Sequence, residues 1–241
     1  MPPLALSAVL TAVLFQTPAP ETLRLFNGRD LDGWTIHLPH ADGADPTTDP
    51  KQVFRVHNGL LHVSGQEFGY IATRDEFEDF HLIVEFRWGD RRWPPRENAK
   101  RDSGICYHVV GPDKVWPRSI ECQIQEGDCG DFWMVDGARL TVRGVRNEPG
   151  SAVRAVKTAD AEKPHGQWNT IEVISQNGSL IHKVNGVVVN QGSDPEPRRG
   201  RILLQSEGAE IVFRRVEITP LDRPHPGQSR ITEPKPRDAT Y

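Results

Sequence analysis

The chain has 241 residues, a formal net charge of −4 and 26% charged residues. No basic run could follow a phosphate backbone or an anionic lipid surface, so we expect no nucleic-acid partner. The 20 prolines and 21 glycines stand between Val- and Ile-containing runs, which favours many short strands joined by turns. A chain of this length suffices for one large sandwich or barrel.

The first residues predict an export signal. Leu4 to Phe15 is small and apolar apart from two hydroxyl residues, and a Gln-Thr-Pro-Ala-Pro stretch after it suits cleavage. The first basic residue is Arg24, so only the α-amino group supplies positive charge before it. The segment is too short to span a bilayer, so we expect no stable membrane anchor. Residues 1–20 are therefore predicted to be a signal peptide of a periplasmic or secreted protein.

The strands expected after this segment are short and follow one another closely. Two of them, Lys51–Val56 and Leu60–Ser64, flank Asn58-Gly59 and predict a hairpin. Apolar and polar residues alternate from Phe80 to Trp88, as in a half-buried strand. The other expected strands are Gly104–Val110, Ser119–Gln125, Trp168–Ser175, Leu180–Val184, Val187–Asn190, Arg201–Ser206 and Glu210–Thr219.

No segment shows a sustained helical period, which predicts an all-β, two-sheet sandwich formed by residues 21–221 as a single domain. Asn-Gly pairs at 177 and 185 predict tight turns in a meander through the second half. Arg91–Arg101 and Arg143–Pro164 are expected to be irregular insertions, which are often functional. Residues 222–241, rich in Pro and Arg, are expected to form a disordered tail.

One segment, S-I-E-C-Q-I-Q-E-G-D-C-G-D-F-W from Ser119 to Trp133, is the most informative for function. Because strand side chains alternate, the apolar residues at 120, 122 and 124 face the core, while Glu121 and Gln123 face the other way. An acidic Gly-Asp turn then leads into Phe132 and Trp133, an aromatic pair suited to a ring-shaped ligand. The pattern suggests a sugar site; the alternative is an edge strand with a solvated outer face.

The cysteines are Cys106, Cys122 and Cys129. An exported protein would normally oxidise two of them, and three pairings are open. Alternatively, Cys106 and Cys122 face each other in the core as free thiols. A zinc site with His108 is conceivable, but the spacing matches no zinc template.

Six separated motifs together resemble the 3-keto-disaccharide hydrolase family. They occur in order as Leu25–Trp34, Asp102–His108, Ser119–Asp128, Gly166–Val173, Val184–Val189 and Gly200–Ile218. The resemblance implies a concanavalin-like jelly-roll β-sandwich that acts on glycosides oxidised at C3, often in exported bacterial proteins. The chain departs from the usual family pattern by having Phe-Arg-Arg-Val at 213–216 and a longer acidic-aromatic turn at 126–133.

The resemblance also implies a chemistry. A ketone at C3 acidifies the hydrogen at C2, so a base can start β-elimination of the C1 substituent, with water adding back afterwards; direct hydrolysis of the glycosidic bond is the alternative. Such a reaction needs a base, an acid and a group that stabilises the enolate. Glu121 and His108 are the expected catalytic groups, and Arg118 is a candidate to stabilise the oxyanion. The alternatives are a cross-strand salt bridge for Glu121, a strand histidine for His108 and a strand end for Arg118.

Further residues are candidates for substrate binding. Gln123 could hold sugar hydroxyls and Trp133 could stack on the ring, unless Trp133 is a core aromatic. Glu126 and Asp128 belong to the acidic turn beside them. A late strand carries two more candidates on one face, which either join the cleft or lie in solvent near a glycine turn; these are Gln205 and Glu207.

A structural Ca²⁺ is the one cofactor the sequence suggests. Jelly-roll carbohydrate domains often hold Ca²⁺ in oxygen-rich loops. Two clusters could supply ligands, although neither matches a fixed template; they are Asn27, Asp30 and Asp32, and Asp128 and Asp131.

Two other functions compete with the 3-keto-glycosidase. Glu121-x-Gln123-x-x-Glu126 resembles the catalytic strand of laminarinase-type retaining glucanases, in which two carboxylates act together. A bulge would have to turn Glu126 to the face of Glu121, and Gln123 replaces the central Asp of that motif. The third candidate is a non-catalytic carbohydrate-binding module.

Overall fold

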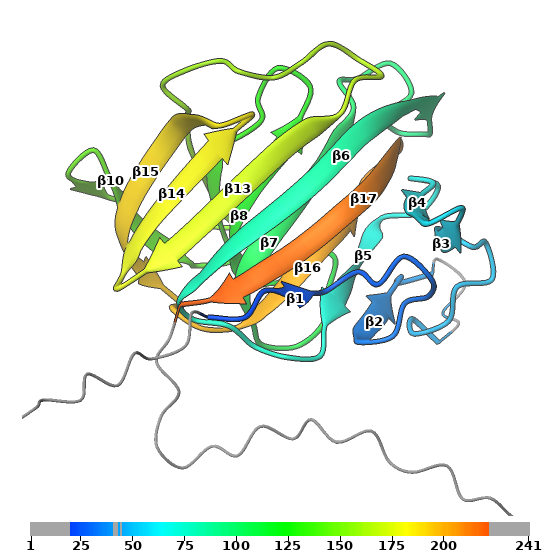
Figure 1. The fold of residues 1–241 in the computed structure, drawn as a ribbon, viewed down its shortest axis with the longest axis horizontal. Coiled ribbons are helices and arrows are strands. Elements are labelled where there is room, and N and C mark those ends of the chain that lie inside the picture. The colour runs from blue at the N-terminus through cyan, green and yellow to red at the C-terminus, as the bar shows by residue number, and fades with distance from the viewer. Residues whose placement is uncertain (1–19, 41–42, 44, 222–241) are drawn as a thin grey trace, which may run out of the picture.

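The computed structural model describes residues 20–40, 43 and 45–221. This part of the chain is built from strands in two antiparallel sheets that face each other (Figure 1), which confirms the predicted all-β sandwich. The predicted tail and all but the last residue of the predicted signal peptide lie outside the described residues. No helix in the described part is long and apolar enough to cross a membrane.

The larger sheet has ten strands and is the layer nearer the viewer in Figure 1. Its long central strands are β6 and β17, and β1 pairs with the outer part of β17. The strands in spatial order are β11 (Val145–Arg146), β10 (Arg139–Val142), β15 (Val187–Glu196), β14 (Ser179–Val184), β13 (Asn169–Gln176), β6 (Phe80–Arg92), β17 (Ala209–Pro220), β4 (Leu60–Val63) and β3 (Phe54–His57), with β1 at Leu23–Arg24.

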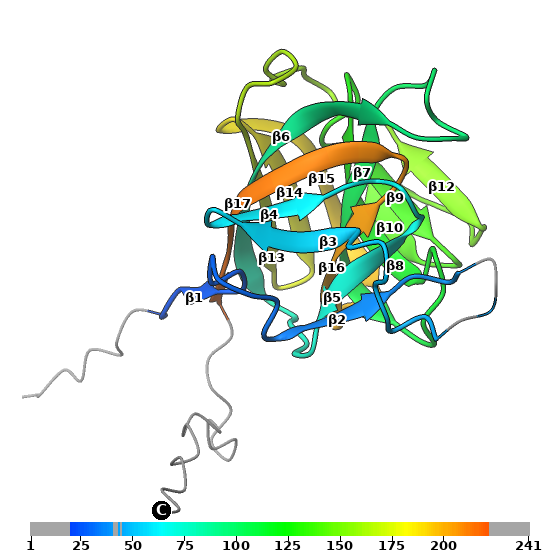
Figure 2. The same cartoon turned by 90° about the vertical axis from the view of Figure 1, so that its right-hand side faces the viewer.

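The smaller sheet has seven strands and lies behind the first in Figure 1. Figure 2 shows the sandwich from the side, with β17, β4 and β3 following one another along the larger sheet. The strands of the smaller sheet in spatial order are β12 (Ala152–Ala155), β9 (Phe132–Val135), β8 (Arg118–Gln125), β7 (Asp102–Val110), β16 (Arg201–Ser206), β5 (Gly69–Thr73) and β2 (Trp34–His37).

Alternation places the core between the sheets. In β6, Phe80, Leu82 and Val84 are buried, while Glu85 faces outward, as the sequence predicted. In β8, the apolar residues at 120, 122 and 124 join the same core. Each large apolar side chain buried in this way stabilises the fold by roughly 1.5–3 kcal/mol.

Asn-Gly turns join neighbouring strands where the sequence predicted them. Asn58 and Gly59 both have positive φ, at 51° and 75°, and connect the paired strands β3 and β4. This backbone matches the right-handed twist of a two-residue hairpin. Asn-Gly pairs at 177 and 185 turn in the same way between β13, β14 and β15.

Several strands have no counterpart among those expected from the sequence. The Arg143–Pro164 insertion contains β11 and β12, and β12 pairs with β9 from Ala152↔Val135 to Ala155↔Phe132. Phe132 and Trp133, assigned to the end of a turn, begin β9. These short strands are recognisable mainly through distant partners, which a local alternation pattern does not contain.

All three cysteines are buried free thiols. Cys122 belongs to the main core, whereas Cys106 lies on the other side of the sheet in a small cluster with Tyr70, Val109 and Leu203. The expected disulfide is therefore not formed, and the alternative of free thiols is confirmed. Cys106 and Cys122 nevertheless do not face each other, because their side chains leave adjacent strands in opposite directions.

Candidate active site

The outer face of the seven-stranded sheet, which points away from the other sheet, carries a cluster of buried carboxyl groups. Glu121 lies on β8, Asp102 begins β7, and Glu207 directly follows β16; their exposed fractions are only 6%, 2% and 7%. The three strands are neighbours in the sheet, and Cys106 lies opposite Glu121 in the β7–β8 register. Acidic residues from three separate parts of the sequence therefore meet on one face.

Among the described residues, one cation, from the first insertion, forms ion pairs with this cluster. Arg96 forms an ion pair with Asp102 and a second one, of 2.9 Å, with Glu207. Gln125 Nε2 also donates a hydrogen bond of 2.6 Å to Asp102. The guanidinium lies 5.9 Å from the centre of the Phe68 ring, which covers one side of the ion pairs.

The two carboxyl groups that contact Arg96 titrate near neutral pH. Burial raises the pKa of Asp102 to about 6, against the opposing effects of Arg96 and Gln125. Burial, together with the negative charge of Asp102, raises the pKa of Glu207 to about 8. One guanidinium can balance the charge of only one carboxylate, so the pair holds its second proton near or above neutral pH.

Glu121 is the carboxyl group without a countercharge. Among the described residues it forms no ion pair and no hydrogen bond, so the alternative of a cross-strand salt bridge was wrong. Its pKa is raised well above the usual value by burial and by the charges of Glu207 and Asp102, although Arg96 acts in the opposite direction. A carboxyl group whose pKa is raised in this way keeps its proton to higher pH and can donate it to a reacting oxygen.

Gly104 makes room for this arrangement. It lies on β7 between β8 and β16, and a methyl group in its place would overlap the Glu121 carboxyl and the Gln205 amide. Glycine is therefore needed at this position for steric reasons, because any side chain would displace Glu121.

The predicted aromatic pair divides between two sides of the sheet. Trp133 lies opposite Glu121 in the β8–β9 register on the outer face, and its indole Nε1 is buried with no partner among the described residues. Phe132 is fully buried in the core, 3.9 Å from the ring of His182. Gln123 shares the face of Glu121, and its Oε1 accepts the Ile124 N–H at 3.0 Å.

A second tryptophan borders the cluster on the opposite side from Trp133. Trp116 lies in the loop between β7 and β8, is 47% exposed, and packs edge-on against Phe68 at 6.2 Å between ring centres. Its hydrogen bond to Glu207 lowers the pKa of that carboxyl, against the larger effect of burial. The carboxyl groups thus lie between two indoles.

His108 does not join the cluster. A bulge at the end of β7 gives His108 a φ of 52° and turns its side chain to the core, where Nε2 lies 3.1 Å from the carbonyl oxygen of Glu78. Burial lowers its pKa to about 4. The structure therefore places the two predicted catalytic groups on opposite sides of the sheet, because the bulge interrupts the alternation of side chains along β7.

Three other predicted site residues are bound in peripheral ion pairs. Arg118 contacts Glu196 of the other sheet at 3.1 Å. In the acidic turn, Glu126 pairs with Arg101 at 2.8 Å and Asp128 with Lys100 at 2.7 Å, so both fasten the turn to the first insertion. The bulge that would bring Glu126 to the face of Glu121 is absent, because β7 and β8 stay in register from Asp102↔Gln125 to Tyr107↔Ile120.

By contrast, Gln205 and Glu207 do lie on the face of Glu121, only 2% and 7% exposed, so the alternative of a solvated strand end was wrong. Four residues of the site were not among those predicted: Arg96, Asp102, Gly104 and Trp116. Two features of the sequence could have indicated some of them. Arg96 lies in a long insertion, and Asp102 and Gly104 belong to the start of one of the six motifs.

The loops suggested for Ca²⁺ use their oxygens within the chain. Asn27 Oδ1 accepts the N–H groups of Arg29 and Asp30, at 2.7 and 3.0 Å. Asp131 forms an ion pair with Arg154 and accepts the N–H of Lys157 at 2.7 Å. No group of three or more His, Cys, Asp or Glu residues in the described ranges is arranged to hold a metal ion, and structural calcium stays a prediction.

Comparison with known proteins identifies the family. The family model of the 3-keto-alpha-glucoside-1,2-lyase-like domain matches residues 21–219. The chain belongs to this family. As a member of the 3-keto-alpha-glucoside-1,2-lyase-like family it is a carbohydrate-active protein, and the suspected family is confirmed. No curated protein matches the chain significantly.

Solved structures agree on the fold of this family member. A proposed glycosyl hydrolase from Parabacteroides distasonis is 21% identical, with 83% of this chain and 94% of that chain covered and a TM-score of 0.57. The β-glucanase of Bacillus licheniformis is 13% identical over 85% of this chain and 99% of that chain, with a TM-score of 0.52. Likeness at this level of identity confirms the jelly-roll sandwich.

Proposed function

We propose that the protein is a glycoside-cleaving enzyme that acts on 3-keto-glycosides. The observation that carries the proposal is Glu121, a buried carboxyl group without a countercharge between Trp133 and the Asp102–Arg96–Glu207 cluster. Membership of the 3-keto-alpha-glucoside-1,2-lyase-like family supports the substrate class. Buried groups with strongly shifted pKa values are frequent at active sites.

The proposed reaction is β-elimination followed by addition of water. A base removes the proton at C2, and the electron pair of that bond forms the enolate of the C3 ketone. The enolate then expels the C1 substituent, so the C1–O bond breaks, a C1=C2 double bond forms and an alcohol leaves with one proton. Addition of water across C1=C2 gives the free 3-keto sugar.

The cluster can divide these proton transfers between two carboxyl groups. Glu207, whose pKa is about 8, is a strong base for the C2 proton once ionised. Glu121, which holds its proton, donates it to the departing oxygen. Each transfer is worth about 10² to 10⁴ in rate. The guanidinium of Arg96 is the cation beside the cluster that can stabilise the enolate.

The surrounding side chains suggest how the substrate is held. We place the 3-keto ring on Trp133, with its hydroxyl groups toward Gln123 on the same face of the sheet. Trp116, exposed on the far side of the cluster, then faces the leaving group. Flat apolar faces of sugars and of aryl groups both pack on indoles.

A release assay with matched variants tests the proposal. A 3-keto-glucoside with a chromogenic aglycone and its unoxidised parent are incubated with wild type, Glu121→Gln and Glu126→Gln. We expect release from the 3-keto substrate only, with at least a roughly 10²-fold lower rate in Glu121→Gln. Glu126→Gln changes a carboxylate of the same segment outside the cluster, so it should stay within a few-fold of wild type.

The same assay separates the competing functions. Release from the unoxidised glucoside would favour a glucanase, and binding of sugar without release would favour a carbohydrate-binding module. In D₂O, elimination and hydration place deuterium at C2 of the product above a control without enzyme, whereas direct hydrolysis does not. Equal rates of wild type and Glu121→Gln would remove Glu121 from the mechanism.

A further inference from the structure

The Glu121 carboxyl shares its space with the amide of Gln205. A methyl group at position 104, in place of the glycine hydrogen, would overlap Glu121 Oε1 from β8 and Gln205 Oε1 from β16. The two oxygens therefore lie side by side over the α-carbon of Gly104. Gln205 is 2% exposed, so water does not replace this neighbour.

The orientation of the Gln205 amide is set by Cys106. Gln205 Nε2 donates a hydrogen bond of 3.5 Å to Cys106 Sγ. This leaves the carbonyl oxygen Oε1 pointing toward Glu121, buried and without a donor among the described residues. A buried acceptor that lacks a donor costs about 1–3 kcal/mol, so such groups almost always find one.

We propose that Gln205 is a positioning residue: its carbonyl oxygen accepts the proton of the neutral Glu121 carboxyl and holds that carboxyl as the acid in the resting protein. The inference rests on the proposed function in taking Glu121 as the proton donor. A neutral carboxyl has one O–H to give, and Gln205 Oε1 is an acceptor with no other donor in the described part of the chain. An ionised Glu121 would instead place a negative charge against a carbonyl oxygen.

The neighbouring carboxyl groups also favour the protonated form of Glu121, whereas Arg96 favours the ionised form. Glu207 and Asp102 disfavour its ionised form by their charges, whereas the guanidinium of Arg96 favours it. Cys106, opposite Glu121 on β7, is fully buried, and burial raises the pKa of its thiol, so it stays neutral. Gln205 differs from these neighbours in favouring the protonated form through a hydrogen bond.

The consequence for the reaction is a fixed order of proton transfers. Substrate binds to a protein in which Glu121 already carries its proton, and Gln205 keeps the O–H from turning toward the carboxyl groups of the cluster. Donation to the departing oxygen then exchanges one acceptor for another. Gln205 itself touches no reacting atom in this scheme.

The pH profile of kcat/KM tests the role of Gln205. Loss of the Glu121 proton gives the alkaline limb of that profile, because kcat/KM reports the free protein. Gln205→Met keeps the size of the side chain but removes the acceptor, and should move the alkaline limb down by about one pH unit, a tenfold change in the protonated fraction at a given pH. Gln205→Glu retains an acceptor oxygen and should keep the limb at or above its wild-type position.

Gln123→Met is the matched control, because Gln123 lies on the same face but its Oε1 is occupied by the Ile124 N–H. It should change KM and leave the alkaline limb in place. An unmoved limb in Gln205→Met would overturn the proposal. A limb moved upward would also overturn it, because it would mean that the amide nitrogen faces Glu121 and stabilises the carboxylate.

A titration without substrate separates this proposal from the proposed function. ¹³C-carboxyl NMR of glutamate-labelled protein, with Glu121→Gln for assignment, follows the Glu121 proton directly in wild type and Gln205→Met. A downward shift of the Glu121 titration in Gln205→Met supports the hydrogen bond even if no 3-keto-glycoside is cleaved. An unchanged titration contradicts it even if cleavage is fast. Thermal unfolding shows that each variant is folded under the conditions of the titration.

Discussion

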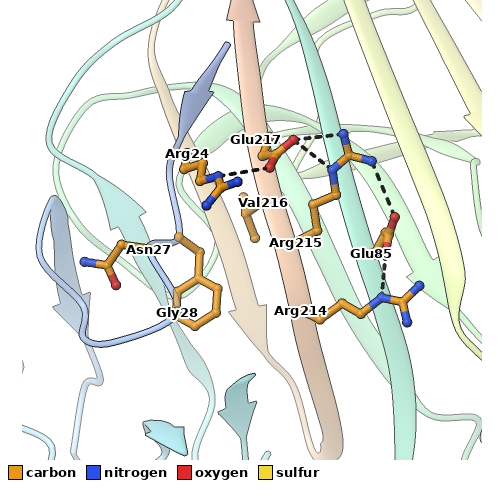
Figure 3. Close-up of a pocket in the computed structure, with 9 residues that line it drawn as sticks. Arg24, Asn27, Gly28, Glu85, Arg214, Arg215, Val216 and Glu217 are labelled. Atoms are coloured by element: carbon orange, nitrogen blue, oxygen red, sulfur yellow. Dashed lines mark hydrogen bonds and ion pairs between the residues drawn. The ribbon is translucent and has the colours of Figure 1, made fainter. Parts of the chain in front are cut away.

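The two outer faces of the sandwich differ in how their charged side chains are paired and buried. On the ten-stranded sheet, charges of alternating sign line a pocket of about 350 Å³ (Figure 3). Arg24, Glu217, Arg215, Glu85 and Arg214 follow one another there as ion pairs, and the Arg24 side chain is 78% exposed. On the seven-stranded sheet, three carboxyl groups are almost entirely buried, and the one guanidinium beside them forms ion pairs with only two, Asp102 and Glu207.

We call the surface formed by Arg24, Glu85, Arg214, Arg215 and Glu217 the paired face. A bulge in β17 brings two of its arginines to the same glutamate. The register of β17 and β6 shifts between Phe213 and Arg215, so that Arg214 and Arg215 both contact Glu85. The Arg214 guanidinium also lies 4.4 Å from the centre of the Trp168 ring. Every arginine of this face that lines the pocket therefore has an anion beside it.

The two faces therefore differ in charge balance: each arginine that lines the pocket has an anion beside it, whereas the buried carboxyl groups outnumber the guanidinium that contacts them. Exposed ion pairs contribute about 0–1 kcal/mol each. Buried carboxyl groups that outnumber their countercharges must keep protons that water would remove. Protons held in this way are available for catalysis, and for that reason the active site that we propose lies on the seven-stranded sheet.

The largest effect is expected from filling the space beside Glu121. Gly104→Ala adds a methyl group that overlaps Glu121 and Gln205, and we expect kcat/KM to fall by about 10² or more, as for displaced catalytic groups generally. Gly89→Ala is the control, because there the methyl group meets the Glu210 side chain on the ten-stranded sheet. Gly89→Ala should stay within a few-fold of wild type. A folded, fully active Gly104→Ala protein would show that Glu121 need not occupy its observed position.

Removal of the shared cation should have the next largest effect. Arg96→Ala leaves Asp102 and Glu207 facing each other without a countercharge. The free energy of unfolding, measured in urea at pH 8, should therefore fall by about 1–3 kcal/mol. This loss is smaller than for a fully buried ion pair because Arg96 is partly exposed. Arg215→Ala breaks pairs on the exposed face and should cost less than about 1 kcal/mol. Equal losses would mean that the two faces do not differ energetically.

The pH dependence of stability should also differ between the faces. Because the folded-state pKa of Glu207 is raised to about 8, the folded protein keeps a proton that the unfolded chain loses, so stability falls as pH rises from about 4.5 to 8. Glu207→Gln removes this loss and should raise Tm at pH 9 by roughly 5 °C while changing little at pH 5. Glu217→Gln, on the paired face, should give no gain at pH 9. If Glu207→Gln lowered Tm at pH 9, the raised pKa would be wrong.

The smallest effect is expected at the edge of the paired face. Arg24→Ala removes a 3.6 Å ion pair with Glu217 in which the arginine side chain is 78% exposed. We expect a change in Tm of about 1 °C or less and unchanged kcat/KM. A loss of activity in this variant would show that the outer faces are coupled.

Much of the sandwich could be predicted because alternation in a strand is a local property. The split of β8 into a core side at Ile120 and an outer side at Glu121 followed directly from this period. The side on which His108 lies could not be predicted from this period, because one extra residue in a bulge exchanges the two sides, and the sequence of β7 does not mark it. The local pattern is reliable only where the register is unbroken.

The rest of the candidate site depends on contacts between distant parts of the chain. Arg96 reaches Glu207, 111 residues later, and the two meet only because β7 and β16 are neighbours in the sheet. Trp116 likewise becomes part of the site through its contact with Glu207. Composition indicated that acidic and aromatic groups were present, but the pairing of the strands determines which of them meet.

The pairing of β1 with β17 brings the two ends of the domain together. Leu23 lies opposite Ile218, and the hydroxyl groups of Thr22 and Thr219 are 2.7 Å apart. A short linker between these ends would therefore close the chain at little entropic cost, and the exposed turn at Asn177-Gly178 could be opened instead. The domain is thus suited to circular permutation, and also to insertion as a unit into a loop of another protein, because its two ends lie together where β1 runs beside β17 (Figure 1).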